Sequence, residues 1–384
     1  MSWFGIETRT SVPPIERGGW LDVMRIVVAI LMILHHFELA GPSPTSELIP
    51  FFERGYLLTD FFLIDSGYVL ARVYGERVLA GGMSLGDFFK KRFLRVVPAH
   101  LIMSLTLIGL VLVSGLLGVM PRNPEWFDWK ELPAQFFLVQ SYGVPGGRGW
   151  NAPSWSISAL LGCYLMFPLL LRGMSRFNPY VALGLGIAVF TACNLATWAI
   201  LNYPVYQMPL KFGIFRALPL FILGMALARF AQQVYLPERL AKGLGLAALA
   251  GFIGVQAFGE FSLISLSLIC AMIMASGAIP VRRRSWLVEK AAVISFSVFI
   301  TNEVVRIAWF GVVNQLIARF DLSQTVQWTL WGMGVTLALA FATAFHYAID
   351  NPIQVAVNRP KKQAGRVRTV VNQPVPYPAR SAQG

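Results

Sequence analysis

The chain has 384 residues, of which 56% are hydrophobic and only 13% are charged, and its mean hydropathy is +0.59. So many apolar residues cannot all be buried in one soluble core. The composition therefore excludes an ordinary soluble protein and predicts a polytopic membrane protein. The net charge of +13 would also suit a protein that binds nucleic acid. Membrane proteins, however, gather Lys and Arg in their cytoplasmic loops, so that explanation must be tested first.

Ten segments have the length and apolar character of membrane spans, which need about 20 residues each. With the N-terminus inside, 23 of the 32 Lys and Arg residues fall in cytoplasmic segments, so nucleic acid is not needed as a partner. The sequence therefore predicts an all-α transmembrane bundle of ten spans with both termini cytoplasmic. The spans are expected near 20–40, 56–74, 98–120, 154–171, 180–201, 212–233, 241–258, 261–279, 290–316 and 327–349.

Three parts of the chain are expected to differ in character. Residues 1–19 contain basic residues but precede no clear cleavage site, so we interpret them as a cytoplasmic segment before a retained first span. Residues 20–352 form the membrane domain. Residues 353–384 combine several prolines with scattered Lys and Arg, which predicts a flexible cytoplasmic tail against anionic lipid.

The first span carries an arginine and two histidines, Arg25, His35 and His36. Arg25 and His36 are eleven residues apart, which on a helix leaves them only about 20° apart around the axis and about 16 Å apart along it. His35 points about 100° away from that face. Charged groups inside lipid are costly and often functional, although Arg25 extending to a headgroup and a structural hydrogen bond from His36 fit about equally well.

The second span contains Asp60 and Asp65, which face different sides of a helix, followed by Ser66 and Gly67. The small Ser66-Gly67 pair predicts a close approach of another helix. The Ser66 hydroxyl can stabilise an oxyanion, or it can simply bond to its own backbone.

The cytoplasmic end of the third span holds four basic residues, Lys90, Lys91, Arg92 and Arg95. Arg92 and Arg95 are three residues apart and share a helix face, and two guanidinium groups placed in this way suit phosphates. A cytoplasmic anchor is the alternative, and we favour it for the two lysines.

An exterior segment, residues 121–153, is rich in Pro and Gly and contains Trp126, Trp129 and Trp150. Its aromatic residues argue against disorder. Tryptophan suits both sugar faces and membrane interfaces, so the segment is either an acceptor entrance or an aromatic belt.

These motifs together resemble the integral-membrane acyltransferase type 3 family. The resemblance covers roughly residues 18–353 and rests on four patterns. They are an arginine, ten residues and a histidine after Leu21-Asp22; Asp60 before Ser66-Gly67; Arg92, Arg95 and Pro98 at three-residue spacing; and Trp155-Ser156-Ile157-Ser158 with Tyr164. Two positions depart from the family pattern: Leu160 replaces an acidic residue, and Asn302 stands where many members have histidine.

The resemblance implies which residues form the site. His36 would be the catalytic base, with Asp60 as its orienter and Ser66 as an oxyanion donor. The substrate-binding residues would be Arg25, Arg92, Arg95 and Trp155, of which Arg92 and Arg95 would hold the phosphates of acyl-CoA. The resemblance implies no bound cofactor, and the three cysteines lie in apolar runs without metal-ligand spacing.

The implied activity is transfer of an acyl group, most often acetyl, from acyl-CoA to a hydroxyl of a carbohydrate, in the bacterial inner membrane. Among family members, the chain most resembles the membrane-bound transacylase that accompanies bacterial cellulose synthesis, which makes a polysaccharide synthase complex an expected partner. A transporter is disfavoured because no internal repeat is visible. A noncatalytic membrane partner of such a synthase remains an alternative because of Leu160 and Asn302.

Overall fold

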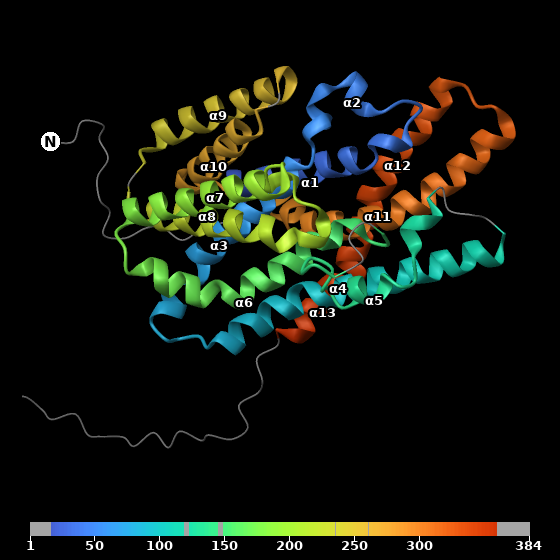
Figure 1. Ribbon diagram of the computed structural model, residues 1–384. Coiled ribbons are helices and arrows are strands. Elements are labelled where there is room, and N and C mark those ends of the chain that lie inside the picture. The colour runs from blue at the N-terminus through green and yellow to red at the C-terminus, as the bar shows by residue number, and fades with distance from the viewer. Residues whose placement is uncertain (1–16, 119–122, 145–148, 235, 260, 359–384) are drawn as a thin grey trace, which may run out of the picture.

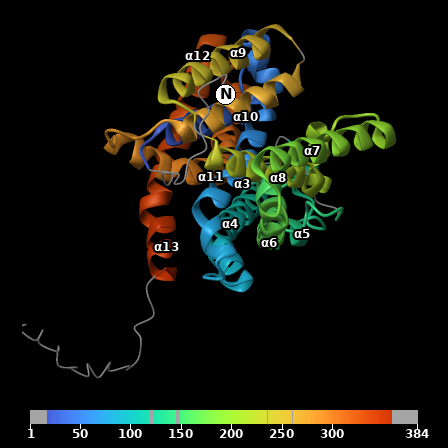
Figure 2. The ribbon, with the colours of Figure 1, turned by 90° about the vertical axis from the view of Figure 1, so that its left-hand side faces the viewer.

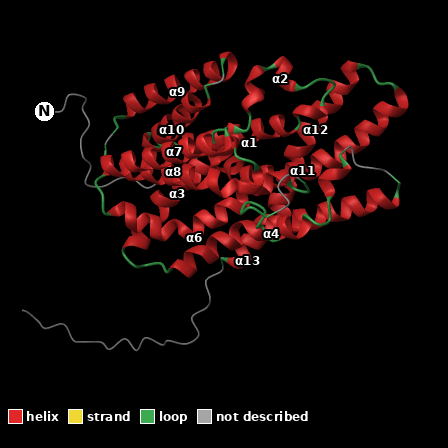
Figure 3. Cartoon of the chain, viewed as in Figure 1, coloured by secondary structure: helices red, strands yellow, loops and turns green. Residues whose placement is uncertain are grey.

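The computed structural model describes residues 17–118, 123–144, 149–234, 236–259 and 261–358, and within these ranges the regular structure is helical, without a strand (Figure 3). This confirms the all-α prediction for the described chain. Each of the ten expected segments corresponds to one long helix (Figure 1). These helices are α1 Trp20–His36, α3 Leu57–Leu79, α4 Leu85–Leu116, α6 Trp155–Ser175, α7 Pro179–Leu201, α8 Gly213–Gln233, α9 Glu238–Phe258, α10 Ser262–Ala278, α11 Trp286–Phe320 and α12 Gln324–Phe345.

Shorter helices complete the described chain. They are α2 Thr45–Leu48, α5 Leu132–Phe136 and α13 Asn351–Val357, and a π-helical turn, His346–Asp350, joins α12 to α13. Figure 2 shows α7 and α13 on opposite sides of the bundle. Of the two expected terminal segments, only residues 17–19 and 353–358 lie within the described chain.

Seven of the described helical stretches are long and apolar enough to cross a membrane, judged by length and composition. They contain α4, α6, α7, α8, α9, α11 and α12. The other three expected spans differ for visible reasons, because α1 and α10 have 17 residues each and α3 carries several charges. The arrangement is that of a multi-pass membrane protein.

Helix α4 differs from its expected start. It begins at Leu85 rather than near residue 98, because the side chain of Ser84 caps the first turn by accepting the N–H of Asp87 at 3.0 Å. Pro98 lies inside the helix, where it removes only one backbone donor. The basic stretch with Arg92 and Arg95 is therefore part of the same rigid helix as the apolar span.

Helices α3 and α8 pack closely in the interior. A Cβ atom on Gly67 would collide with the Phe221 carbonyl, and one on Gly224 would collide with that of Ile64. The two backbones can approach this closely only because both positions are glycine, which confirms the close approach expected at Gly67. This contact fixes α3, which carries the buried charges of the second span.

The described part of the tryptophan-rich segment, residues 123–144 and 149–153, is folded. Phe127, Leu138 and Trp150 pack in one hydrophobic cluster with residues of α4 and α11. The indole N–H of Trp150 donates to the Asp128 carbonyl at 3.0 Å, while Trp129 remains exposed. The aromatic residues thus hold this segment against α4 and α11; Pro121 and residues 145–148 lie outside the described chain.

Candidate functional site

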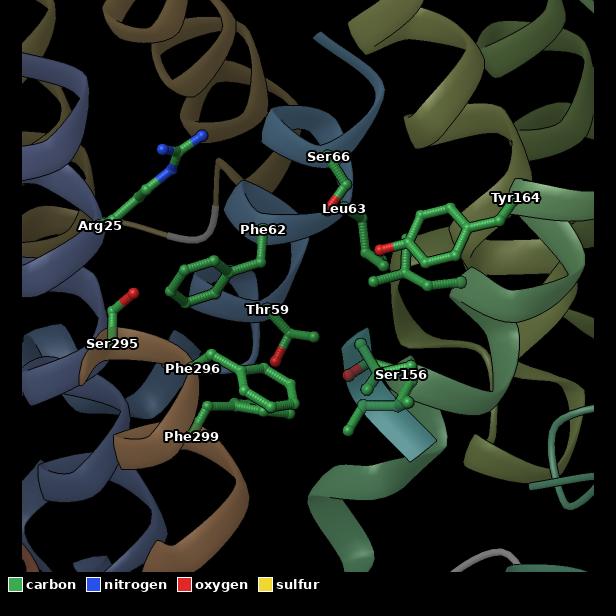
Figure 4. A pocket seen from close by; sticks show the side chains of 13 residues that line it. Arg25, Thr59, Phe62, Leu63, Ser66, Ser156, Tyr164, Ser295, Phe296 and Phe299 are labelled. Carbon is green, nitrogen blue, oxygen red and sulfur yellow. The ribbon is translucent and has the colours of Figure 1, made fainter. Parts of the chain in front are cut away.

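A partly open cavity of about 170 Å³ lies among α1, α3, α4, α6 and α11 (Figure 4). Two of the expected site residues, Arg25 and Ser66, line it. Leu160, the position where the chain departs from the acidic pattern, lines it too. Its other walls alternate apolar side chains with hydroxyl groups, from Thr59, Phe62, Leu63, Val96, Ser156, Ile157, Tyr164, Ser295, Phe296 and Phe299.

Arg25 reaches the cavity from α1 while two carboxylates hold it. Its Nε and Nη2 donate to the two oxygens of Asp65 on α3, at 2.8 and 3.3 Å, and its Nη1 donates to Asp22 at 3.0 Å. Asp22 also accepts the backbone N–H of Gly18 at 2.8 Å. A guanidinium held by two partners in this way keeps one orientation, so Arg25 presents a fixed positive charge to the cavity.

His36 lies at the other end of α1 and contacts α11. Its Nδ1 is 2.8 Å from Oδ1 of Asn302, and the Asn302 amide is anchored to carbonyls of its own helix. His36 is not among the described residues that line the cavity. Its partner helix does reach the cavity, because Phe299, one turn before Asn302, forms part of the wall.

His35 points away from this contact. Its ring lies against Gly55 of the loop that follows α1, and its Nδ1 is 3.5 Å from a carboxylate oxygen of Glu38. The two neighbouring histidines therefore meet different elements, as the helical spacing indicated.

Asp60 is buried on α3 and its partner is Arg216 of α8. The Arg216 Nε donates to Asp60 at 2.8 Å, and the Arg216 Nη2 donates to the Tyr56 carbonyl at 3.0 Å. The same guanidinium lies 5.3 Å from the ring centre of Trp155. Asp60 and Trp155 thus belong to one buried cluster around Arg216, while the hydrogen-bond partner of His36 is Asn302.

Ser66 and Tyr164 face each other from α3 and α6. Both side chains line the cavity, and the Tyr164 hydroxyl points toward α3 (Figure 4). Ser66 therefore places a hydroxyl at the cavity, where a bound molecule can contact it.

The two arginines of α4 lie beyond one edge of the cavity. Arg92 donates to the Tyr74 hydroxyl at 2.7 Å and lies over its ring. Arg95 donates to both oxygens of Asp350, at 3.0 and 3.2 Å, and lies 4.6 Å from the ring centre of Phe296, a cavity residue. Each guanidinium is thus oriented by one partner and remains partly exposed.

The folded tryptophan-rich segment adjoins the Asn302 end of the site. The Asn151 side chain donates to the Ile300 carbonyl of α11 at 3.5 Å, and Arg306 of α11 lies 5.3 Å from the ring centre of Trp126. In the same segment, burial raises the pKa of Tyr142 to about 12, and its hydroxyl donates to the Ser158 carbonyl at 2.8 Å. That phenol stays protonated and fastens the segment to α6.

Four residues of this arrangement were given no role by the sequence: Asp22, Asp65, Arg216 and Asn302. In the sequence, Asn302 was notable only because many family members have histidine at that position. Asp65 was notable only as a carboxylate on a different helix face from Asp60. No local spacing joins Asp60 to Arg216 or His36 to Asn302, because each pair comes from distant helices. Within the described residues, no group of three or more His, Cys, Asp or Glu side chains could hold a metal ion.

Comparison with known proteins matches residues 19–345 to the family described as an acyltransferase domain. Among curated proteins, "Protein 2 in picA locus" of Rhizobium radiobacter is 36% identical over 93 residues, which is 24% of this chain and 44% of that protein. "Acyltransferase MdmB" of Streptomyces mycarofaciens is 32% identical over 167 residues, 42% of this chain and 41% of that protein. The chain thus matches less than half the length of either relative, and no solved structure matches.

Proposed function

Because the chain belongs to the acyltransferase family over residues 19–345, we propose that it is a membrane-bound O-acyltransferase. It moves an acyl group, in the first instance acetyl, from acyl-CoA to a hydroxyl of a carbohydrate, with an exopolysaccharide such as cellulose as the expected acceptor. The observation that carries this proposal is the pairing of His36 with Asn302, one turn from a cavity that Arg25 and Ser66 line.

The membrane arrangement follows from the helices and the charges. We propose that all ten long helices cross the bacterial inner membrane, with both termini cytoplasmic. The basic residues of α4 and of the loop before α11 then lie inside, as the positive-inside rule requires. His36 and the tryptophan-rich segment then lie toward the exterior.

The donor enters from the cytoplasmic side in this arrangement. Arg92 and Arg95 bind the CoA phosphates, and the pantetheine arm occupies the cavity, whose mixed apolar and hydroxyl walls suit a chain that contains amides. The rise of α1 between Arg25 and His36 is about 16 Å, a distance comparable to an extended pantetheine arm. The thioester therefore reaches His36 while the nucleotide stays in the cytoplasm.

The acceptor enters from the exterior, past the tryptophan-rich segment. His36 removes the proton of the acceptor hydroxyl while its oxygen attacks the thioester carbonyl. Ser66 supplies a donor for the oxyanion that forms on the carbonyl oxygen. The C–S bond then breaks, the CoA sulfur takes the proton from His36, and the acyl group stays on the acceptor oxygen.

A second candidate is a noncatalytic membrane partner of a polysaccharide synthesis and export system. Leu160 favours it, because a cavity residue is apolar at the position where the family pattern is acidic. Release of CoA from acetyl-CoA by the purified protein separates the two candidates. A noncatalytic partner would release none, with or without an acceptor.

The test of the proposed base compares two neighbouring histidines. In purified protein given acetyl-CoA and cellotetraose, we expect His36→Ala to lose acyl transfer by roughly two to four orders of magnitude, as for a lost general base. We expect His35→Ala to retain most activity, because His35 contacts Gly55 and Glu38. Loss of activity in His35→Ala with an active His36→Ala would show that the wrong histidine has been assigned.

A further inference from the structure

The side-chain amide of Asn302 is fully buried on α11, with contacts at both of its ends. Its Nδ2 donates to the carbonyl oxygens of Val298 and Phe299, at 3.2 and 2.7 Å, and its Oδ1 lies 2.8 Å from Nδ1 of His36. The residue is only 1% exposed. All of its partners are therefore protein groups in fixed positions.

These partners permit only one orientation of the amide. Turning it over would place Oδ1 against two carbonyl oxygens, which accept hydrogen bonds and cannot donate them. Leaving such buried groups unsatisfied costs about 1–3 kcal/mol each. The oxygen of Asn302 must therefore face His36, and since this oxygen can only accept, Nδ1 of His36 must carry a proton.

We propose that Asn302 is a positioning residue that fixes the tautomer of the catalytic histidine. A neutral imidazole carries one N–H, so a proton held on Nδ1 leaves the lone pair on Nε2. Nε2 is then the atom that takes the proton from the acceptor hydroxyl and returns it to the CoA sulfur. This inference rests on the proposed function, and it names the nitrogen that performs the proton transfer.

The other charged groups near His36 have partners of their own, so they do not fix its tautomer. Glu303 and Arg306 of α11 interact electrostatically with His36, but they pair with each other through two hydrogen bonds at 2.8 and 2.6 Å. His35, on the same helix as His36, is directed toward Glu38. The direct contact to the His36 ring from α11 is the Asn302 oxygen.

Kinetics of two Asn302 variants test the role. In the acetyl-CoA and cellotetraose assay, we expect Asn302→Leu to lower kcat roughly 10–100-fold with little change in KM for acetyl-CoA, as when a group that orients a catalytic ligand is lost. We expect Asn302→Asp to keep more of kcat than Asn302→Leu, because one carboxylate oxygen still accepts from Nδ1 of His36 although the other now faces the carbonyls of Val298 and Phe299. We also expect it to move the acid limb of the pH–rate profile about one unit higher, because a carboxylate stabilises the imidazolium. Thr301→Val is the matched control, since Thr301 is buried beside Asn302 and its hydroxyl donates within α11.

A kcat for Asn302→Leu equal to that of Thr301→Val, or an Asn302→Asp profile that does not move, would overturn the inference. If the wild-type protein releases no CoA in the same assay, the proposed function has failed instead, and if His36→Ala is fully active, His36 is not the base. The tautomer can also be read without catalysis, in wild-type protein labelled with 15N-histidine, with the His36 signals assigned by their absence from His36→Ala. We expect a protonated Nδ1 and an unprotonated Nε2, and the reverse pattern contradicts the inference even if the variants do not fold.

Discussion

Helix α3 carries two buried carboxylates that each hold an arginine from another helix, and the two pairs differ in what else the arginine meets. Asp60 holds Arg216 and Asp65 holds Arg25, both at 2.8 Å. The Arg216 side chain is 5% exposed and is enclosed by Tyr56 and Trp155, whereas the Arg25 side chain is 22% exposed and lines the cavity.

The comparison separates a structural pair from a pair of the same chemistry that we propose to bind substrate. A buried ion pair loses much of its attraction to desolvation, so its presence alone says little about function. What distinguishes Arg25 is that part of its guanidinium faces a space that a substrate can occupy. The partners of Arg216 are all protein groups, which suits a role in joining α3 to α8.

The largest expected effect is loss of stability at the structural pair. We expect Asp60→Asn to destabilise the protein by about 3–5 kcal/mol, because the Arg216 charge remains buried without its counterion. Thermal unfolding in detergent measures this, with Asp65→Asn as the matched control. The control should lose less, since Arg25 keeps Asp22 as a partner. Equal losses in both variants would remove the distinction between the pairs.

The second expected effect is loss of activity at the binding pair. We expect Arg25→Gln to lose some stability, because Asp65 and Asp22 are left without their counterion, and the folded variant to have kcat/KM for acetyl-CoA lowered roughly 100-fold, equivalent to about 2.7 kcal/mol, because a positive charge at the cavity is removed. CoA release by the purified variant measures this. Arg216→Gln should show the opposite pattern, with poor folding. A well-folded and fully active Arg25→Gln would assign both pairs to structure.

Much of the fold was predictable because it depends on local sequence. Runs of apolar residues marked every long helix, and the helical period placed His35 and His36 on different faces. The start of α4 was missed although its signal, a capping Ser84, lies in the sequence. The expected span began near residue 98 because the apolar run begins there, whereas the helix also includes the basic stretch before it.

The partners within the site were not predictable in the same way. Asp60 was expected to orient His36, and the structure places it on Arg216, while Asn302 takes the position beside His36. Such pairings join residues more than 150 positions apart and depend on which helices become neighbours. The location of Leu160 in the cavity likewise follows from the packing of α6 against α3 and α4.

A third arginine, Arg95 of α4, extends the series toward the side that we propose to be cytoplasmic. Arg95 is held by Asp350, but its side chain is 31% exposed, more than that of Arg25 or Arg216. The pair should therefore contribute least to stability, because solvent screens it. The exposed part of the guanidinium is the part that a phosphate can reach.

The smallest expected effect is accordingly a change in donor affinity. We expect Arg95→Gln to fold, to keep kcat within about twofold, and to raise KM for acetyl-CoA roughly tenfold, as for a group that binds the donor equally in the ground and transition states. Acetyl-pantetheine, which lacks the nucleotide, should show no such rise, because it has no phosphate for Arg95 to hold. Lys90→Ala is the control, since Lys90 is expected to serve only as a cytoplasmic anchor. If Arg95→Gln weakens both donors alike, Arg95 acts through the shape of the cavity edge at Phe296, and it then belongs with Arg216 among the structural pairs.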